Sequence, residues 1–508
     1  MNFSALSIKN PIPAIILFTL LTLAGLLAFK ATPVQDFPDI DLPIVIISAT
    51  LEGAAPAQLE TEVARKLENS VATLEGIKHI ITTVRDGEVT IQVHFVLEKV
   101  TSDAVNEVRN AVDKIRTDLP ASLRDPSVSR VSNAGRAVLV FSVSSDKLDE
   151  QELSWFIDNT VTKKLLTIPG LGAVKRLGGV TREALIELDP AKMDALKISA
   201  LEVSHRLKMV QQEISGGRGD VSGAEQSVRT IATVKSVDEL ASIELPLQQG
   251  NQDNRKIRLD QIATIIDTFS ERRSIALENG NSVVAMEILR TRGASEIEVA
   301  AKARELVANL KTEYPNVLFN PVIDNSIPVK ENFEGSISML YEGAILAVLV
   351  LWFFLRDWRS TFVAAIALPL SVIPAFFGMK LFDFTLNTVT LLSLALGVGI
   401  LVDDAIVEIE NISRHLRMGK TPMQAATEAA DEIGLAVIAT TFALIAVFLP
   451  TAFMNGVAGK FFKQFGWTAV LAIITSLVVA RMLTPLMAAY LLKPPKDDIS
   501  NDGWVMQR

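Results

Sequence analysis

The stretch GVGILVDDAIVEIENISRHL (Gly397–Leu416) begins like a membrane helix and then carries Asp403, Asp404, Glu408 and Glu410. The residues just before it, 391–396, are apolar enough to lie in hydrocarbon. A charged side chain at the centre of a bilayer costs roughly 2.5–3.5 kcal/mol on insertion scales. We therefore expect these carboxylates to serve a function that offsets this cost.

The composition indicates a chain of mixed character. Its 508 residues are 49% hydrophobic, with a mean hydropathy of +0.33, yet 21% are charged. Apolar spans at some positions and a large polar region elsewhere explain both values. The net charge of −9 gives no reason to expect nucleic-acid binding. The absence of cysteine excludes disulfides and thiolate metal sites.

Six apolar runs in a 1 + 5 arrangement predict the membrane spans. The first, Ile12–Phe29, is long enough to cross a bilayer, and no small-residue cleavage site follows it cleanly, so we interpret it as a retained anchor within residues 1–32. About 300 residues without a span come next. The other five runs lie within residues 333–493, at Ile337–Leu355, Phe362–Phe382, Leu386–Ile409, Gly434–Phe453 and Phe465–Leu492.

Basic residues predict the orientation. Short basic loops mark the cytoplasmic side, and the connections after spans two, four and six alternate correctly to share one side with Lys9. Lys460 and Lys463 fall on the other side but do not outweigh this pattern. The large region is then periplasmic in a Gram-negative cell, and the tail 494–508 is cytoplasmic. The residues that carry the argument are Lys9, Arg356, Arg359, Arg414, Arg417, Lys420, Lys493 and Lys496.

The region 33–135 has the pattern of one α+β unit. A hairpin is predicted around Asp86-Gly87, because alternating apolar residues flank a strong turn dipeptide. Together with its neighbours this gives the order βαββαβ, a ferredoxin-like unit. The other expected elements are a strand at Pro43–Glu52, helices at Ala57–Leu74 and Thr101–Leu119, and a strand near Val128–Val131.

A similar unit follows in two parts, at 136–180 and 281–332. Between them, residues 181–280 are rich in short β signals and glycine, which predicts an inserted, mostly β domain, with Ile214–Gly223 as an exposed arm or hairpin. The expected elements of the second unit are strands at Ala137–Ser145, Gly172–Gly179, Ser282–Leu289 and Asn316–Asp324, and helices at Asp149–Thr167 and Ala294–Leu310.

The aspartates fall on two adjacent stripes of a predicted helix. We expect both to lie on a side lined by small residues, where glycines let another helix approach and shield them from lipid. Asp403 lies eleven residues before Arg414, or about 16 Å at 1.5 Å per residue, well inside the bilayer. One stripe is Ser393, Gly397, Asp404, Glu408 and Asn411, and the other is Gly399, Asp403, Glu410 and Arg414.

Adjacent buried carboxylates favour proton uptake, because desolvation and like charge both destabilise the charged form. A site that is neutral with a proton and charged without one can use a proton gradient. The alternative is a structural salt bridge to another helix, but no span offers a lysine at matching depth.

These features together resemble the resistance–nodulation–division (RND) superfamily, over nearly the whole chain. The form GILVDDAIVEIEN resembles its hydrophobe/amphiphile efflux branch, whereas the heavy-metal branch has Asp-Gly-Ala at this point, so Asp404 argues against metal export. The resemblance implies a multi-pass inner-membrane antiporter for multidrug efflux and antibiotic resistance, without a cofactor or metal. Asp403 and Asp404 would form its proton relay.

The resemblance also implies an architecture and partners. The twin units would be porter subdomains and the insertion a docking domain with its arm at Gly216, Gly217, Arg218 and Gly219. The assembly would be a homotrimer that binds a periplasmic membrane-fusion adaptor and an outer-membrane channel, and that exports small amphiphilic compounds.

Two departures from the family pattern matter. Family members are about twice as long, with a second copy of the 1 + 5 plan that carries the basic partner of the relay. We therefore expect this chain to be the N-terminal half, as a fragment or as part of a split transporter. In addition, the positions of the aromatic drug pocket are aliphatic here, at Ala137 or Val138 and at Leu177.

Other polar residues in the spans leave alternatives open. Arg481 could pair with Asp403 or Asp404, or it could snorkel or bond to neighbouring carbonyls. Glu408 could extend a proton path or stand as a lone polar residue near the helix end. Glu410 and Asn411 match the family motif, with helix packing favoured over proton carriage. The four histidines show no metal-ligand spacing, and no nucleophile–base constellation suggests an enzyme.

Two functional hypotheses follow from the sequence. The first is a proton-driven exporter of hydrophobic or amphiphilic compounds. The second is a non-transporting scaffold or remnant that anchors a periplasmic adaptor through its docking domain. In the second case Asp403→Asn would be silent, while deletion of Ser215–Ser222 would break assembly.

Overall fold

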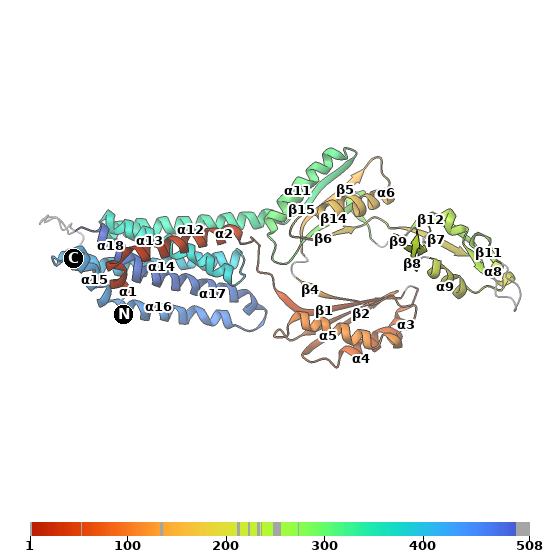
Figure 1. Cartoon of the computed structure of the whole chain (residues 1–508), viewed down its shortest axis with the longest axis horizontal. Helices are drawn as coiled ribbons and strands as arrows, with labels where there is room; N and C mark the ends of the chain where they lie inside the picture. The colour runs from red at the N-terminus through yellow and green to blue at the C-terminus, as the bar shows by residue number, and fades with distance from the viewer. Residues whose placement is uncertain are drawn as a thin grey trace.

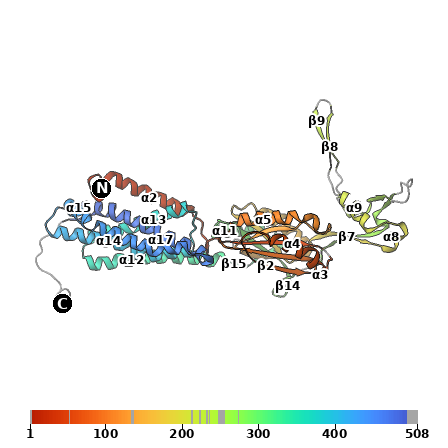
Figure 2. The ribbon, with the colours of Figure 1, turned by 90° about the horizontal axis from the view of Figure 1, so that it is seen from below.

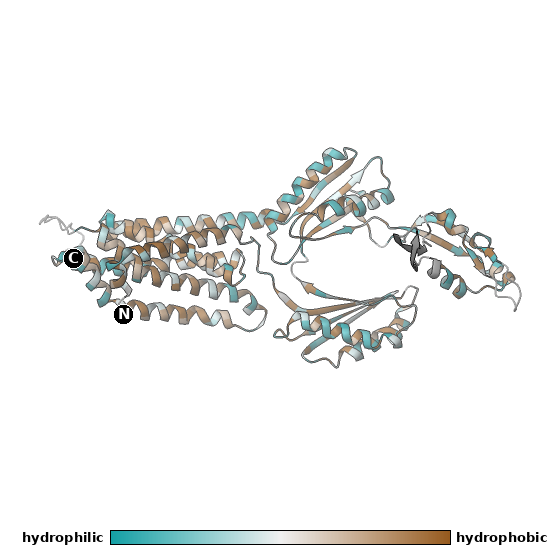
Figure 3. Ribbon diagram, viewed as in Figure 1, coloured by the Kyte–Doolittle hydropathy of each residue, from teal (hydrophilic) through white to brown (hydrophobic). Residues whose placement is uncertain are grey.

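The computed structural model describes residues 3–51, 53–132, 136–210, 214–221, 224–230, 234, 236–246, 256–272 and 274–493. It has a bundle of long helices at one end and α+β units at the other (Figure 1). The apolar residues are concentrated in the bundle, while polar residues cover the helices of the α+β units (Figure 3). The predicted tail 494–508 lies outside the described residues.

Six helical segments among the described residues are long and apolar enough to cross a membrane, which confirms the predicted number. They are α2 (Pro11–Ala31), α12 (Ser326–Leu355), α13 (Trp358–Leu381), α14 (Thr388–Arg417), α16 (Gly434–Phe448) with the short turn η6 (Leu449–Phe453), and α17 (Gly456–Val478), which continues through the π-helical turn η7 (Val479–Leu483) into α18 (Thr484–Leu491).

Helices α12, α14 and α17 are markedly longer than the predicted spans, and α17 begins at Gly456 rather than Phe465. Helix α12 begins at Ser326 rather than Ile337, and α14 continues to Arg417 rather than stopping at Ile409. Hydropathy marks only the part of a helix that fits in hydrocarbon, whereas backbone hydrogen bonding continues through polar residues. All three helices therefore extend beyond their apolar runs.

Two further helices, α1 (Phe3–Lys9) and α15 (Pro422–Glu432), lie at the end of the bundle farthest from the α+β units (Figure 1). Basic residues collect there, and we call it the basic end. Its members are Lys9, Arg356, Arg359, Arg414, Arg417, Lys420 and Lys493.

Small residues bring the helices of the bundle together. A Cβ at Gly25 of α2 would lie 2.2 Å from the carbonyl oxygen of Ile373 on α13, so only glycine fits there. Close backbone approach of this kind is a main source of helix association in membranes. Helices α12 and α16 instead leave most of their apolar side chains exposed, at 6% and 17% buried within their most apolar windows. Their outer faces suit contact with lipid.

The first α+β unit has a four-stranded antiparallel sheet in the order β2-β3-β1-β4. Asp86 and Gly87 join β2 to β3, which confirms the predicted hairpin, and Gly87 has the positive φ of 75° that the turn needs. Its elements are β1 (Asp41–Thr50), α3 (Pro56–Leu59), η1 (Glu60–Ala64), α4 (Arg65–Val71), β2 (Ile77–Arg85), β3 (Glu88–Phe95), α5 (Thr101–Lys114) and β4 (Ser127–Ser132).

The second unit repeats this strand order, with β6, β14, β5 and β15 in the places of β2, β3, β1 and β4. One extra strand, β13 (Ala276–Glu278), pairs with β14, so the sheet already resumes before residue 280, the predicted end of the insertion. The elements are β5 (Ala137–Ser145), α6 (Glu150–Phe156), η4 (Ile157–Val161), α7 (Thr162–Leu165), β6 (Leu171–Leu177), β14 (Asn281–Arg290), α11 (Glu296–Glu313) and β15 (Val317–Asp324).

The inserted segment lies at the end of the molecule opposite the bundle (Figure 1). Strands β7 (Arg182–Leu188) and β12 (Ala263–Phe269) form its stem. The hairpin of β8 (Ile214–Val221) and β9 (Ala224–Thr230) projects away from the rest (Figure 2). Besides strands it contains three helices that its glycine-rich pattern did not predict, α8 (Pro190–Leu196), α9 (Ala200–Val210) and α10 (Val237–Ala241). Its short strands are β10 (Glu244–Pro246) and β11 (Lys256–Arg258).

An extended segment, residues 33–39, leaves α2 and contacts both the bundle and the second unit. Gln35 N donates to Leu386 O (3.0 Å) just before α14, and Glu296 N donates to Val34 O (3.0 Å) at the start of α11. The segment therefore lies between the N-terminal ends of these two helices.

Candidate functional site

Helix α14 places two adjacent carboxylates at the middle of the bundle. Its start is fixed by a capping box, in which Asn387 Oδ1 accepts from Thr390 N (3.1 Å) and Thr390 Oγ1 accepts from Asn387 N (3.0 Å). Asp403 and Asp404 fall at the midpoint of the helix, which runs from Thr388 to Arg417. These ends locate the aspartates far from both polar boundaries.

The two predicted stripes of α14 have different surroundings. All five members of the Asp404 stripe are buried, and Asp404 itself is 9% exposed. All four members of the Asp403 stripe are exposed. The side that the aspartates share is therefore covered only around Asp404.

Asp404 has one hydrogen-bond donor near it. Ser476 of α17 directs its hydroxyl at Asp404 Oδ2 (3.4 Å) and at Leu401 O (3.1 Å). A hydroxyl at this distance is a weak partner for a carboxylate. An ionised Asp404 would therefore be poorly compensated in this arrangement.

The expected close approach of a helix at the two glycines is wrong for the described part of the chain. The nearest atom to a Cβ at Gly397 would belong to Leu401 of the same helix, 3.9 Å away, and nothing lies within 4 Å at Gly399. The small residues leave space along α14 that no described helix fills.

Arg481 does not pair with either aspartate. Its Nη1 donates to Ala430 O (2.5 Å) at the end of α15 and lies 3.9 Å from Glu408 Oε1. The carbonyl alternative is thus the one observed, and Glu408 is the acidic neighbour. Glu408 is fully buried, at 0% exposed.

At the basic end, α14 and α15 are joined through Glu432. Asn411 Nδ2 donates to Ala429 O (3.1 Å), which gives Asn411 a helix-packing contact, while Glu410 points outward. Glu432 accepts from Arg414 (2.7 Å) and from His415 Nε2 (2.8 Å). The hydrogen bonds from His415 and Arg414 lower the pKa of Glu432 from 4.5 to about 2.

This junction predicts a specific pH dependence. A carboxyl group whose pKa is lowered on folding contributes stability above its unfolded pKa and loses it as the pH falls toward the folded value. We expect amide exchange in α15, corrected for intrinsic rates, to be constant from pH 7 to about 5 and to accelerate as the pH falls from about 4.5 toward 2. Glu432→Gln should show faster exchange than wild type above about pH 4.5 and approach the wild-type rate as the pH falls toward 2. A variant with the wild-type profile throughout would contradict this role.

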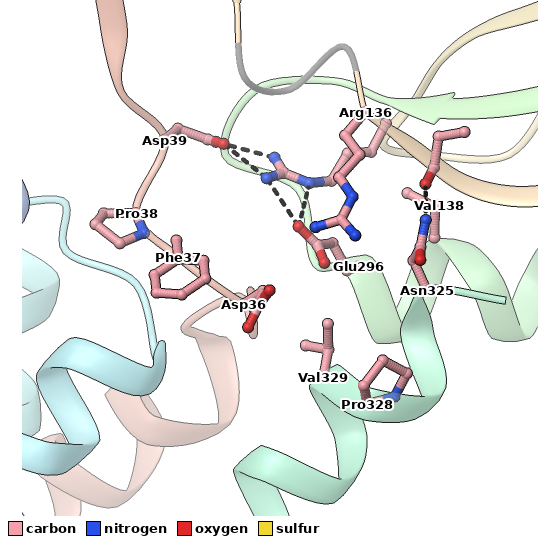
Figure 4. Close-up of a pocket in the computed structure, with 12 residues that line it drawn as sticks. Asp36, Phe37, Pro38, Asp39, Arg136, Val138, Glu296, Asn325, Pro328 and Val329 are labelled. Carbon is pink, nitrogen blue, oxygen red and sulfur yellow. Dashed lines mark hydrogen bonds and ion pairs between the residues drawn. The ribbon is translucent and has the colours of Figure 1, made fainter.

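Two of the predicted pocket residues lie together. Ala137 and Val138 line a cavity of about 300 Å³ at the junction between the bundle and the second unit (Figure 4). Leu177 does not line it. That residue lies on β6, paired with Ala285 of β14, and is 42% exposed. The other lining residues are Asp36, Phe37, Pro38, Asp39, Arg136, Arg290, Glu296, Asn325, Pro328 and Val329.

The predicted arm residues lie in the β8–β9 hairpin. Arg218 pairs with Ser227 and Gly219 with Gln226, and the register shifts at Gly216 and Gly217. The described hairpin ends at residue 221 on one strand, and residues 222 and 223 lie outside the described residues.

One charged cluster was missed from the sequence. Arg290 at the end of β14 donates to both carboxylate oxygens of Asp39 (3.0 and 2.7 Å) and, through Nε, to Glu296 (3.0 Å). The three side chains are 5%, 10% and 16% exposed. The sequence offered one signal for this cluster, an arginine at the end of an apolar strand. Its partner Asp39 could not be predicted, because it lies 251 positions away in sequence.

Comparison with known proteins agrees with this arrangement. The model of the AcrB/AcrD/AcrF family matches residues 3–506. The chain belongs to this family. It is thus a multi-pass membrane protein of the RND superfamily, as the resemblance implied.

The relatives of this RND chain are longer than it is. It is 31% identical over 494 residues to an uncharacterized transporter of Haemophilus influenzae, covering 97% of this chain and 47% of that protein. It is also 31% identical over 496 residues to the multidrug resistance protein MdtC of Pantoea ananatis, with 97% and 48% covered. For MdtC of Pectobacterium atrosepticum the identity is 29% over 498 residues. The chain spans about half the length of the curated relatives that it matches.

Proposed function

We propose that this RND chain is the N-terminal half of a proton-driven efflux pump, the inner-membrane component of a tripartite system. The pump exchanges protons for hydrophobic or amphiphilic compounds and is a secondary active transporter. The observation that carries the proposal is the pair Asp403–Asp404 at the midpoint of α14, inside a bundle of candidate membrane helices. Asp404 is buried there, and among the described residues its one hydrogen-bond contact is the weak one from Ser476.

A buried carboxylate without a basic partner is more stable with a proton than without one. Such a group binds a proton from the acidic side of a membrane and releases it when its surroundings become more polar. Alternating between these states couples the proton gradient to a conformational cycle. Asp403 and Asp404 are the residues that we assign to this relay.

The second half of the pump would cover the open face of α14. That face carries Asp403, Glu410 and Arg414 among apolar side chains, and charged groups facing lipid are costly. The relatives that this chain matches have about twice its length, which leaves room for a second set of spans. We infer that the exposed stripe packs against helices of that half, which would fill the open space at Gly399.

We assign the remaining parts by the same family plan. The two α+β units, 33–135 and 136–180 with 281–332, are ferredoxin-like porter subdomains, and the cavity at Ala137 and Val138 belongs to the substrate path. The insertion 181–280 is a docking domain, whose hairpin reaches a neighbouring subunit of a homotrimer. The basic end faces the cytoplasm, and the α+β units face the periplasm, where an adaptor and an outer-membrane channel bind.

A direct test measures export in cells. Bacteria that carry the complete pump should accumulate severalfold less of a lipophilic cationic dye than cells without it, and a protonophore should remove the difference. The dye is a probe for the amphiphilic class. Equal accumulation of dyes of differing charge and size in both strains would contradict export and favour the scaffold hypothesis.

A further inference from the structure

Glu408 is a buried acidic group that the pair Asp403–Asp404 does not account for. Its side chain is 0% exposed, and neither carboxylate oxygen has a hydrogen-bond partner among the described residues. It lies four residues after Asp404, which is about 6 Å toward the basic end. An isolated carboxylate in an apolar interior is strongly destabilised when ionised, so this position favours a bound proton or a nearby cation.

That cation is Arg481, which is held beside Glu408 without bonding to it. The separation of 3.9 Å between Nη1 and Oε1 permits Coulomb attraction but exceeds hydrogen-bond length. The same Nη1 donates to Ala430 O (2.5 Å), a carbonyl in the last turn of α15, where a helix end attracts cations. The guanidinium therefore has two competing partners, a backbone carbonyl and a carboxylate.

The structure also makes room for this guanidinium. A Cβ at Gly434, the first residue of α16, would lie 2.6 Å from Arg481 Nη2. Glycine at this position leaves the space that the guanidinium occupies. Its approach to Glu408 needs only a movement of about 1 Å, to a hydrogen-bond length of about 3 Å.

The charges around Glu408 are few. Asp404 on the same helix and Arg481 on η7 act on it electrostatically. Helix α15 carries three acidic residues. Glu432 is engaged by Arg414 and His415, and Glu428 by Lys420. The third is Asp431, and α1 has Lys9 at the basic end. Helices α16 and α18 have no charged residue, and those of α13 and α17 lie at helix ends.

Asp404 and Glu408 are thus two buried carboxylates one helical turn apart, and one cation, Arg481, lies beside Glu408. If both carboxylates were ionised, the three side chains would carry a net negative charge. If one of them holds a proton, the formal charges of the three side chains sum to zero in either arrangement. Moving the proton from the Asp404 carboxyl to the Glu408 carboxylate leaves this balance unchanged, with Asp404 ionised and Glu408 protonated afterwards.

We propose that Glu408 is a further proton-carrying residue, between Asp404 and the basic end, and that Arg481 beside it stabilises its ionised form. This inference rests on the proposed proton-driven function. It assigns the basic-end side of Asp404 as the direction in which the proton leaves.

The test separates this claim from transport itself. Infrared titration of the purified chain in lipid nanodiscs, in the protonated-carboxyl region, reads the carboxyl groups without any substrate. We expect Glu408→Gln to remove one titrating carboxyl and to shift a second, Asp404. Glu342→Gln, the same chemical change at an exposed position of α12, should not shift the Asp404 titration. If the Glu408→Gln and wild-type spectra showed the same number of titrating buried carboxyl groups, the proposal would be overturned.

Two further measurements test the claim, and the first of them still applies if Glu408→Gln fails to fold. Gly434→Ala keeps every titrating group but displaces the guanidinium, so the Glu408 band should shift in pH while its amplitude stays. In the complete pump, Glu408→Gln should lower dye export about tenfold or more and move its pH profile. An unmoved band in Gly434→Ala, or an unchanged pH profile in Glu408→Gln, would each count against it. A failure of Asp404→Asn to affect export would refute the proposed relay instead, and the titration would still decide whether Glu408 binds a proton.

Discussion

Asp404→Asn is expected to abolish proton-coupled export, with a loss of roughly 100-fold or more in the complete pump. An amide has nearly the shape of the carboxyl group but cannot bind and release a proton at physiological pH. The hydroxyl of Ser476 can still contact the amide, so the bundle should keep its packing. Dye efflux from energised cells measures the loss, and membrane abundance and oligomeric state show whether assembly is retained.

The matched control is Asp383→Asn, the same change outside the helices. Asp383 lies between α13 and α14 and has a positive φ of 54°, a conformation that asparagine adopts readily. Its export should equal that of wild type. Full export by Asp404→Asn with normal abundance would show that the relay does not depend on this carboxyl group.

Arg290→Met is expected to loosen the junction between the bundle and the second α+β unit. It leaves the buried carboxylates of Asp39 and Glu296 without their cation, and removal of one partner from a buried ion pair costs about 3–5 kcal/mol. Burial raises the pKa of Asp39, but hydrogen bonds from Arg290 and the Gly293 amide outweigh it and keep that pKa below its usual value. The Asp39–Arg290 ion pair is therefore formed at neutral pH, whereas burial raises the pKa of Glu296.

Hydrogen exchange at the amides of Gly293 and Glu296 measures this effect, because both donate into the junction. The expected cost corresponds to exchange that is roughly two to four orders of magnitude faster. Arg182→Met is the control, since Arg182 pairs with Asp267 at the exposed stem of the insertion, and such pairs contribute little. Equal protection at the two amides in Arg290→Met and wild type would mean that the cluster does not hold the junction.

The sequence predicted the elements well because their signals are local. Apolar runs located the six spans, and the Asp86-Gly87 turn located a hairpin. The start of α12 was predicted too late and the end of α14 too early. Hydropathy indicates whether a residue lies in lipid or in water, and it does not indicate where backbone hydrogen bonding stops. The helices of the insertion were not predicted because they are short and their apolar residues show little helical periodicity.

The site was predictable in position but not in its surroundings. Helical periodicity placed Asp403 and Asp404 on adjacent stripes, but which stripe is covered depends on the other helices. The contacts of Arg481 with Glu408 and Ala430 depend on η7, which lies far from α14 in sequence, and on the packing of α15 against α14. The Asp39–Arg290 contact depends on the sheet of the second unit meeting the segment after α2.

The most direct test of the account measures proton movement driven by substrate. The complete pump is reconstituted in proteoliposomes with a pH-sensitive dye inside, and a gradient of a lipophilic cation is imposed. The account predicts a proton flux opposite to the substrate flux in the wild type and in Asp383→Asn, and none in Asp404→Asn. Substrate movement without any proton flux, or an undiminished proton flux in Asp404→Asn, would contradict the claim that the carboxylates of α14 drive export.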